Sequence, residues 1–278
     1  MDEGEGWFAG INSGDVATGT ERVRSGEAPA PEDWPQVAVE KGFAPNTDEY
    51  YERLHAATLE AARTAVAERE GSDDRQLVHS VRAMDDCRRQ ANELAERVAE
   101  WAGSRDADAG TGIEYARDIA ARDPADPVEA EVVGLASETV ALGERADRLR
   151  AFVERAAPEV APNLSDLAGP VLAARLVSLA GGLESLAKKP SGTVQVLGAE
   201  DALFAHLQGD APSPKHGAIF AHEHVRQTTP AQRGSAARAL AGKLSIAARV
   251  DHYSGDRRSE LAAQLEERIE RIRARDSG

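Results

Sequence analysis

Basic side chains that could bind phosphate return in the second half of an otherwise acidic chain. The 278 residues hold 48 acidic and 33 basic groups, for a formal net charge of −15. Within residues 175–249, however, nine basic residues stand against five acidic ones, a net of +4, and four of the five lysines lie there. A local return of Lys and Arg favours an anionic partner. The alternative is a segment that has drifted toward neutrality.

Three of these basic residues share one expected helix at 236–250. Arg238 and Lys243 are five residues apart, and Lys243 and Arg249 are six apart. At 3.6 residues per turn, Arg238 and Arg249 fall nearly in line, an arrangement that can flank a phosphate track. The alternative is an ordinary solvated helix face.

Metal binding and catalysis have weaker support. His222 and His224, with His216 nearby, are the best candidate ligands, but no fourth ligand has a suitable spacing, so no metal is expected. The single Cys87 excludes a disulfide framework and a cysteine-built zinc site. No G-x-G-x-x-G after a strand, G-x-S-x-G or P-loop is present, so the sequence predicts neither an enzyme nor a cofactor.

The overall composition places the protein in solution. No run approaches the roughly 18 apolar residues of a membrane helix, and the N-terminus lacks a signal pattern, so we expect a cytoplasmic protein that binds no membrane. The acidic surplus and the scarcity of lysine resemble proteins that work in molar salt.

Two long helices are expected at 73–102 and 128–156, joined by a loop rich in Asp, Gly and Ala at 104–112. Apolar residues at heptad spacing predict an antiparallel hairpin, with the second helix ending before Pro158. Narrow seams and charged outer faces favour a coiled coil that dimerises, and the alternative is the wall of a bundle. The residues assigned to dimerisation are Leu77, Val81, Met84, Val98, Leu135, Leu142 and Leu149.

The segments before and after the expected hairpin differ in composition. Residues 1–46 contain few large apolar groups (Trp7, Phe8, Trp34 and Phe43), too few for an independent core. After Pro158, helices are expected at 172–179, 200–207 and 236–250, and a charged helix at 257–275 carries an apolar stripe of Leu261, Leu265 and Ile269 or Ile272. Short apolar runs at 193–197 and 217–220 look like strands, so pattern alone suggests an α+β domain here.

Residues 161–251 resemble the NOP domain. The matching words are APNL (161–164), GPVLAARLVSLAGGLESLAKKPSGTVQVLGAEDALFAHL (169–207), PKHGAIF (214–220), QRG (232–234) and ARALAGKLSIAARVD (237–251). The chain is similar to archaeal members of the Nop56/Nop58 family, scaffolds of box C/D guide ribonucleoproteins. Residues 73–101 also resemble the start of that family's coiled coil.

The resemblance implies an all-α protein in which a long antiparallel helical hairpin precedes a compact helical NOP domain. The two strand-like runs then become helix starts or loops. The expected divisions are a shortened N-terminal region that binds a methyltransferase (1–46), a coiled-coil dimerisation region (47–158), the NOP domain (159–252) and a charged helix (253–278).

The implied partners are a box C/D guide RNA, a small kink-turn-binding protein, a fibrillarin-like methyltransferase and a second copy of the chain. The scaffold itself catalyses nothing, and the particle methylates ribose 2′-hydroxyls. By residue type and family position, the expected RNA-binding residues are Lys188, Gln195, Lys215, His222, Arg233, Arg238, Lys243 and Arg249. His222 is expected to stack on a splayed base.

The sequence also departs from the family. About 46 residues stand where members carry a full α/β domain for fibrillarin, Asp201 replaces a common Lys, and Thr229, Pro230 and Ala231 replace bulky groups. The alternatives are an RNA-independent structural coiled-coil protein and a NOP factor of another RNA assembly, such as a spliceosomal one.

Overall fold

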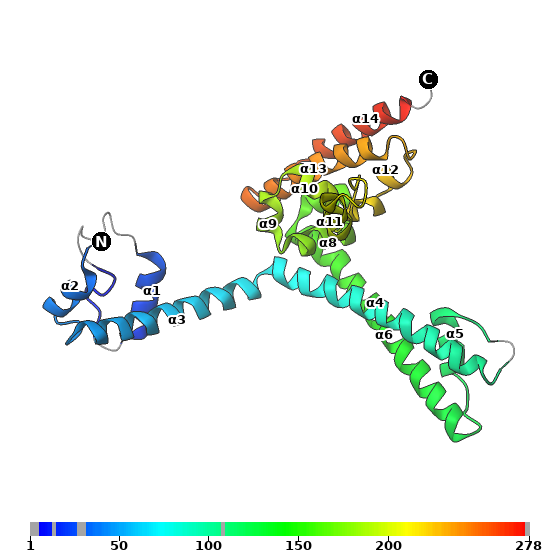
Figure 1. Cartoon of the computed structure of the whole chain (residues 1–278), viewed down its shortest axis with the longest axis horizontal. Coiled ribbons are helices and arrows are strands. Elements are labelled where there is room, and N and C mark those ends of the chain that lie inside the picture. Colours follow the sequence, from blue (N-terminus) through cyan, green and yellow to red (C-terminus); the bar gives the residue numbers. More distant parts are fainter. Residues whose placement is uncertain (1–5, 13–14, 27–31, 107–108, 276–278) are drawn as a thin grey trace. The chain divides into compact units, whose positions relative to one another are not determined.

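The computed structural model describes residues 6–12, 15–26, 32–106 and 109–275. Over these ranges the regular structure consists of fourteen α-helices and one 3-10 helix, with no strand (Figure 1). The prediction of an all-α protein is confirmed. The chain divides into two compact units, Met1–Ser72 and Asp73–Gly278, and each is described by itself.

The first unit contains α1 (Val16–Ser25), α2 (Trp34–Glu40) and α3 (Thr47–Gly71). Its core consists of Phe8, Ala38, Phe43, Ala44 and Tyr50, with Trp7 and Trp34 packed against it. These aromatic residues do not form the core by themselves, because α3, which begins at Thr47, contributes Tyr50 and the half-buried Leu54 to it. The prediction that residues 1–46 lack an independent core agrees with this packing.

The second unit begins with the predicted hairpin. Helices α4 (Asp73–Gly103) and α6 (Pro127–Val160) run antiparallel, since Leu77 clusters with Ala157 while Val98 clusters with Val132 (Figure 1). Asp126 caps α6 by accepting hydrogen bonds from the N–H groups of Val128 and Glu129, both at 2.9 Å. This cap and the Pro127 that follows it explain why α6 begins here.

Two features of the hairpin differ from prediction. Helix α6 continues through Pro158 to Val160 instead of ending before the proline. The helix α5 (Gly112–Ala120) was not predicted, and its buried Tyr115, Ala116 and Ile119 pack beside Val98. A stripe of only three residues on a nine-residue helix is too short for periodicity to reveal.

The seam of the hairpin follows the prediction on α4 and deviates from it on α6. Leu77, Val81, Met84 and Val98 are all buried, each at 6% exposure or less. On α6 the predicted Leu135, Leu142 and Leu149 are only half-buried. The buried positions of α6 are instead mostly small residues: Val132, Ala136, Thr139, Gly143, Ala146, Val153 and Ala157. Small side chains let the two helices approach closely, so the leucines flank the contact.

The rest of the second unit packs around α13. Its helices are α7 (Pro162–Ala168), α8 (Pro170–Ala180), α9 (Leu183–Lys188), α10 (Ser191–Val196), α11 (Glu200–Gln208), the 3-10 helix η1 (Ala218–Ala221), α12 (Glu223–Arg226), α13 (Arg233–Tyr253) and α14 (Glu260–Ala274). Helix α13 buries Leu240, Leu244 and six small residues and contacts α7, α9, α10, α12 and α14. The apolar stripe predicted for the last helix is confirmed, with all four residues buried.

The strand interpretation of 193–197 and 217–220 was wrong. These runs belong to α10 and η1, as the family resemblance implied. The two segments nevertheless lie side by side, because Gly217 N–H donates to the Gln195 carbonyl (3.0 Å) and Ala218 N–H to the Leu197 carbonyl (2.8 Å). Two such bonds without a continuing ladder do not make a sheet.

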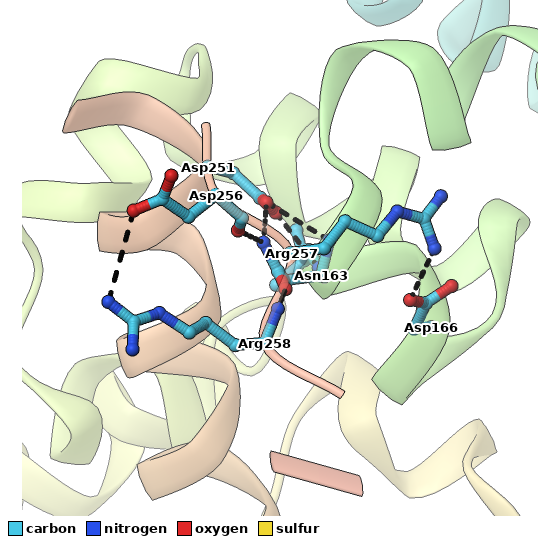
Figure 2. A network of polar contacts seen from close by, with 7 residues as sticks. Asn163, Asp166, Asp251, Asp256, Arg257 and Arg258 are labelled. Carbon is cyan, nitrogen blue, oxygen red and sulfur yellow. Dashed lines mark hydrogen bonds and ion pairs between the residues drawn. The ribbon is translucent and has the colours of Figure 1, made fainter. Parts of the chain in front are cut away.

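A polar network around the buried Asn163 joins the last turn of α13 and the loop after it to α7 (Figure 2). The Asp251 carboxylate accepts hydrogen bonds from the N–H groups of Asn163 (3.0 Å) and Leu164 (2.9 Å), in the first turn of α7. The Asn163 side chain donates to Asp251 (2.6 Å) and to the Asp256 carbonyl (2.8 Å), and accepts from Arg258 N–H (2.7 Å). This network fixes the loop from which α14 starts.

No helix in the described part of the chain combines the length and the apolar character needed to cross a bilayer.

Candidate nucleic-acid interface

A loop presents Lys215 at the start of α13. The Gln195 side chain donates a 2.7 Å hydrogen bond to the Lys215 carbonyl, which adds to the backbone bonds between α10 and this loop. The aliphatic stem of Lys215 passes close to Gly234, where a Cβ would lie 3.9 Å from it. Lys215 is exposed. Gln195 therefore positions the loop, and Lys215 places a positive charge beside the first turn of α13.

Three planar groups stack beside this lysine. The rings of His216 and Phe220 are parallel to within 21° with centroids 4.6 Å apart, and the Arg233 guanidinium carbon lies 5.5 Å from the Phe220 centroid. Arg233 Nε also donates to the Thr228 carbonyl at 3.1 Å, which fixes its direction. We call Gln195, Lys215, His216, Phe220 and Arg233 the basic–aromatic cluster.

The electrostatics of the cluster favour a neutral imidazole. Burial is the main cause that lowers the pKa of His216, and the positive charge of Arg233 lowers it further. The cluster thus combines flat neutral rings with two cations. Such a combination can stack on a nucleobase and hold an adjacent phosphate.

Arg249 lies near the other end of α13 and anchors α9. Its Nε donates to the Ala187 carbonyl (3.1 Å) and a terminal nitrogen donates to the Lys189 carbonyl (3.3 Å). Lys188 forms an ion pair with Glu184 at 2.6 Å. A cation at the carbonyl end of a helix is stabilising, so Arg249 has a structural role beside any contact to RNA. Arg249 thus contacts the carbonyls of the residues on either side of Lys188.

Arg238 lies on α13 between Arg233 of the basic–aromatic cluster and Arg249. It is exposed and forms no ion pair or hydrogen bond with another residue of the described ranges. Eleven residues separate it from Arg249, which corresponds to about 16 Å along the helix on nearly the same side. Between them, Gly242 leaves open space above the helix. Arg238 is therefore the basic residue of α13 that is most available to a phosphate.

Lys243 and His222 lie outside the line that Arg238 and Arg249 form along α13. Lys243 Nζ donates to the Gln264 side chain of α14. His222 Nε2 lies 2.9 Å from the Leu167 carbonyl, and its Nδ1 accepts from His224 N–H at 3.1 Å, which caps α12. Burial, the main cause, lowers the pKa of His222. Only the face of this ring is left for a base, so its stacking role stays a prediction.

Four further residues of interest are not among the expected RNA-binding residues. His216 and Phe220 are four apart within PKHGAIF, a spacing that the sequence shows. On α11, Phe204 and Leu207 are 64% and 73% exposed, and no residue of that helix is buried. The sequence predicted this helix but not that its apolar pair faces outward.

The described residues contain no group of three or more His, Cys, Asp or Glu side chains that could hold a metal ion. The residues assigned to dimerisation on α4 pack within the chain, against α6 and α8. A dimer through the hairpin stays a prediction, and the half-buried Leu142 of α6 is the assigned residue outside the buried clusters.

Comparison with known proteins shows which family the chain resembles. A family model described as "Nop: snoRNA binding domain, fibrillarin" matches residues 72–273, most of the chain. An uncharacterized NOP5 family protein of Methanocaldococcus jannaschii is 34% identical over 275 residues, covering 86% of this chain and 66% of that protein. Nucleolar protein 56 of Homo sapiens is 38% identical over 139 residues, covering 50% and 23%.

Among solved structures, a chain in a crystal structure of a fibrillarin/Nop5p complex matches with a TM-score of 0.52 and 26% identity, covering 92% of both chains. The present chain spans about two thirds of the archaeal relative's length and about a quarter of the human one's. The match across most of its residues and the words quoted above lead to one conclusion. The chain belongs to the Nop domain family.

Proposed function

We propose that this protein is a non-catalytic scaffold of a box C/D ribonucleoprotein. It binds guide RNA together with a small kink-turn-binding protein, and it recruits a fibrillarin-like methyltransferase for guided ribose 2′-O-methylation of rRNA or tRNA. The observation that carries the proposal is the basic–aromatic cluster followed along α13 by the unpaired Arg238.

The chemistry of that surface fits a kinked RNA. A splayed base stacks on the neutral His216–Phe220 pair, while Lys215 and Arg238 contact phosphates on either side. Because Arg238 has no partner among the residues that the structure describes, its contact to a phosphate breaks no ion pair with any of them.

The kink-turn protein supplies the apolar part of the binding energy. The exposed Phe204 and Leu207 of α11 offer an apolar pair to a partner surface, and they precede the Lys215 loop in the same domain. RNA and protein would then be recognised together by one composite surface.

The remaining partners rest on the family. Similarity along 92% of a chain from a fibrillarin/Nop5p complex supports recruitment of the methyltransferase, and the long hairpin supports self-association. The proposal assigns the chemistry of methyl transfer to the recruited enzyme and the placement of RNA to this chain.

The test is a fluorescence anisotropy titration of a labelled box C/D RNA in about 2 M KCl, with and without the small kink-turn-binding protein. We expect tight binding only when that protein is present, and R238A to weaken binding by about five- to tenfold. R148A, which removes an exposed arginine of α6, is the matched control. No binding with or without the partner, at low as well as high salt, would leave an RNA-independent structural protein.

A further inference from the structure

The first unit contains a cavity that the RNA-binding role does not use. It measures about 190 Å³ and lies between the segment 7–12, the start of α1 and the first half of α3. Its walls include Trp7, Ile11, Val16 and Phe43, and its floor is formed by Gly19 and Ala57. Drug-sized ligands need roughly 300–1,000 Å³, and a cavity of about 150 Å³ can hold benzene. The size therefore fits one side chain.

The aromatic wall is held in place by the fold. Trp7 Nε1 donates to the Tyr50 hydroxyl at 3.2 Å, and the Trp7 and Phe43 rings meet edge to face with centroids 5.3 Å apart. A Cβ on Gly19 would come within 3.2 Å of the Trp7 ring, so the glycine permits this close packing. The cavity is thus a feature of the packed unit.

The rim of the cavity is acidic. Asp15, Glu49 and Glu52 line it together with the single base Arg53, which gives three negative charges against one positive charge. Hydrogen bonds from Thr18 lower the pKa of Asp15 and keep its carboxylate ionised. Arg53 is paired with Glu49 at 3.0 Å, and Glu52 forms no ion pair with a described residue. The rim repels phosphate and attracts a cation.

Apolar walls beneath an acidic rim suit a side chain with an aliphatic stem and a positive end. Arg53 itself shows that this environment accepts a guanidinium, since its carbon lies 5.3 Å from the Phe43 centroid while it is paired with Glu49. We propose that the cavity is a docking pocket for an arginine or lysine side chain presented by a protein partner. A free amino acid also carries a carboxylate, which the rim repels, so a residue within a chain fits better.

The test is a titration of the isotope-labelled full chain, followed through the indole N–H signal of Trp7. The probes are the capped tripeptide Gly-Arg-Gly, the same peptide with norleucine in place of arginine, and free arginine. We expect saturable shifts with the arginine peptide, and at least fivefold weaker responses to the other two. E52Q should weaken binding of the arginine peptide about threefold.

A matched pair of variants separates the pocket from the rest of the surface. Ala56 and Ala62 are both exposed on α3, but only Ala56 lines the cavity. A56L should fill the pocket and abolish the Trp7 response, whereas A62L should leave it unchanged, with equal melting temperatures for both. Equal responses to the norleucine peptide or to free arginine, or an undiminished response in A56L, would overturn the proposal. The outcome is independent of RNA binding.

Discussion

At the scale of residues, both ring nitrogens of His222 are already used in hydrogen bonds. Its Nε2 donates to the Leu167 carbonyl, and its Nδ1 accepts from the His224 N–H; the second bond requires the neutral ring, since a protonated Nδ1 has no lone pair to accept with. His224 lies next to it with ring centroids 4.8 Å apart and is paired with Glu266 of α14 at 3.1 Å. Protonation of His222 Nδ1 would remove the cap of α12 and add a charge to this group.

The pH dependence of stability follows from that geometry. Because the pKa of His222 is lowered by burial, the unfolded chain takes up this proton first as the pH falls below about 6.5. Stability contributed by the neutral ring is complete above pH 6.5 and is lost between that pH and the lower pKa of the folded state. The negative charges of Glu223 and Glu266 raise the pKa of His222 and so narrow the pH range over which this stability is lost.

We expect the melting temperature of the wild type to fall between pH 7.5 and 5, and H222Q to show a smaller fall over the same range. The pKa of His216 is also lowered, so H216Q serves as the comparison for a histidine outside the α12 cap. Thermal melts by circular dichroism at constant salt decide the matter. An identical pH dependence in H222Q and the wild type would show that His222 does not carry the effect.

At the scale of elements, hydrogen bonds to Asn163 and Leu164 join α7 to the end of α13 and the loop after it. Asn163 is 2% exposed, and its side chain forms three hydrogen bonds within the network of Figure 2. Removing it leaves the Asp256 carbonyl and the Arg258 N–H without this partner. Each of the three hydrogen bonds that are lost contributes about 0.5–1.5 kcal/mol to stability.

N163A should therefore destabilise the protein by about 2–3 kcal/mol, which for a domain of this size corresponds to a melting temperature lower by roughly 5–10 °C. N92A is the control, because Asn92 is an exposed residue within α4 and alanine favours a helix. Differential scanning calorimetry measures both variants. A loss below 1 °C for N163A would mean that the network contributes little to holding α7.

The whole molecule separates its charges. Residues 161–278 carry 13 acids and 15 bases, so the excess of acid resides in the first 160 residues, and the part that we propose binds RNA is close to neutral. Affinity that comes only from neutralising phosphates falls as salt is added. On a plot of log affinity against log salt concentration, the slope is roughly −0.7 to −0.9 per phosphate contact. A protein that works in molar salt therefore needs stacking, shape and its partner for most of its affinity.

We expect the complete complex of RNA, kink-turn protein and scaffold to show a shallow slope, of about −2 to −3, between 0.2 and 2 M KCl. The kink-turn protein should raise the affinity without making the slope steeper, since it adds apolar and stacking contacts. Anisotropy titrations at four salt concentrations provide the slopes. A steep loss of affinity that the partner does not reduce would contradict the composite surface.

The sequence by itself determined the long helices of the hairpin, the last helix and the family. Periodicity placed α4 to within one residue at each end, the Asp126-Pro127 pair marked the start of α6, and the stripe of α14 was read correctly. These features depend on local spacing and capping, which can be read directly from the order of the residues. The quoted words of the NOP domain then indicated where RNA-binding residues should lie.

Only the tertiary structure decided which of those residues are already engaged. Arg249 anchors Ala187 from 62 residues away, His222 reaches Leu167 across 55, and Arg238 meets no described partner. The same holds for the arrangement of His216 on Phe220 and for the cavity behind Trp7. Such contacts join distant parts of the chain, and local periodicity records which face a side chain occupies but not what that face meets.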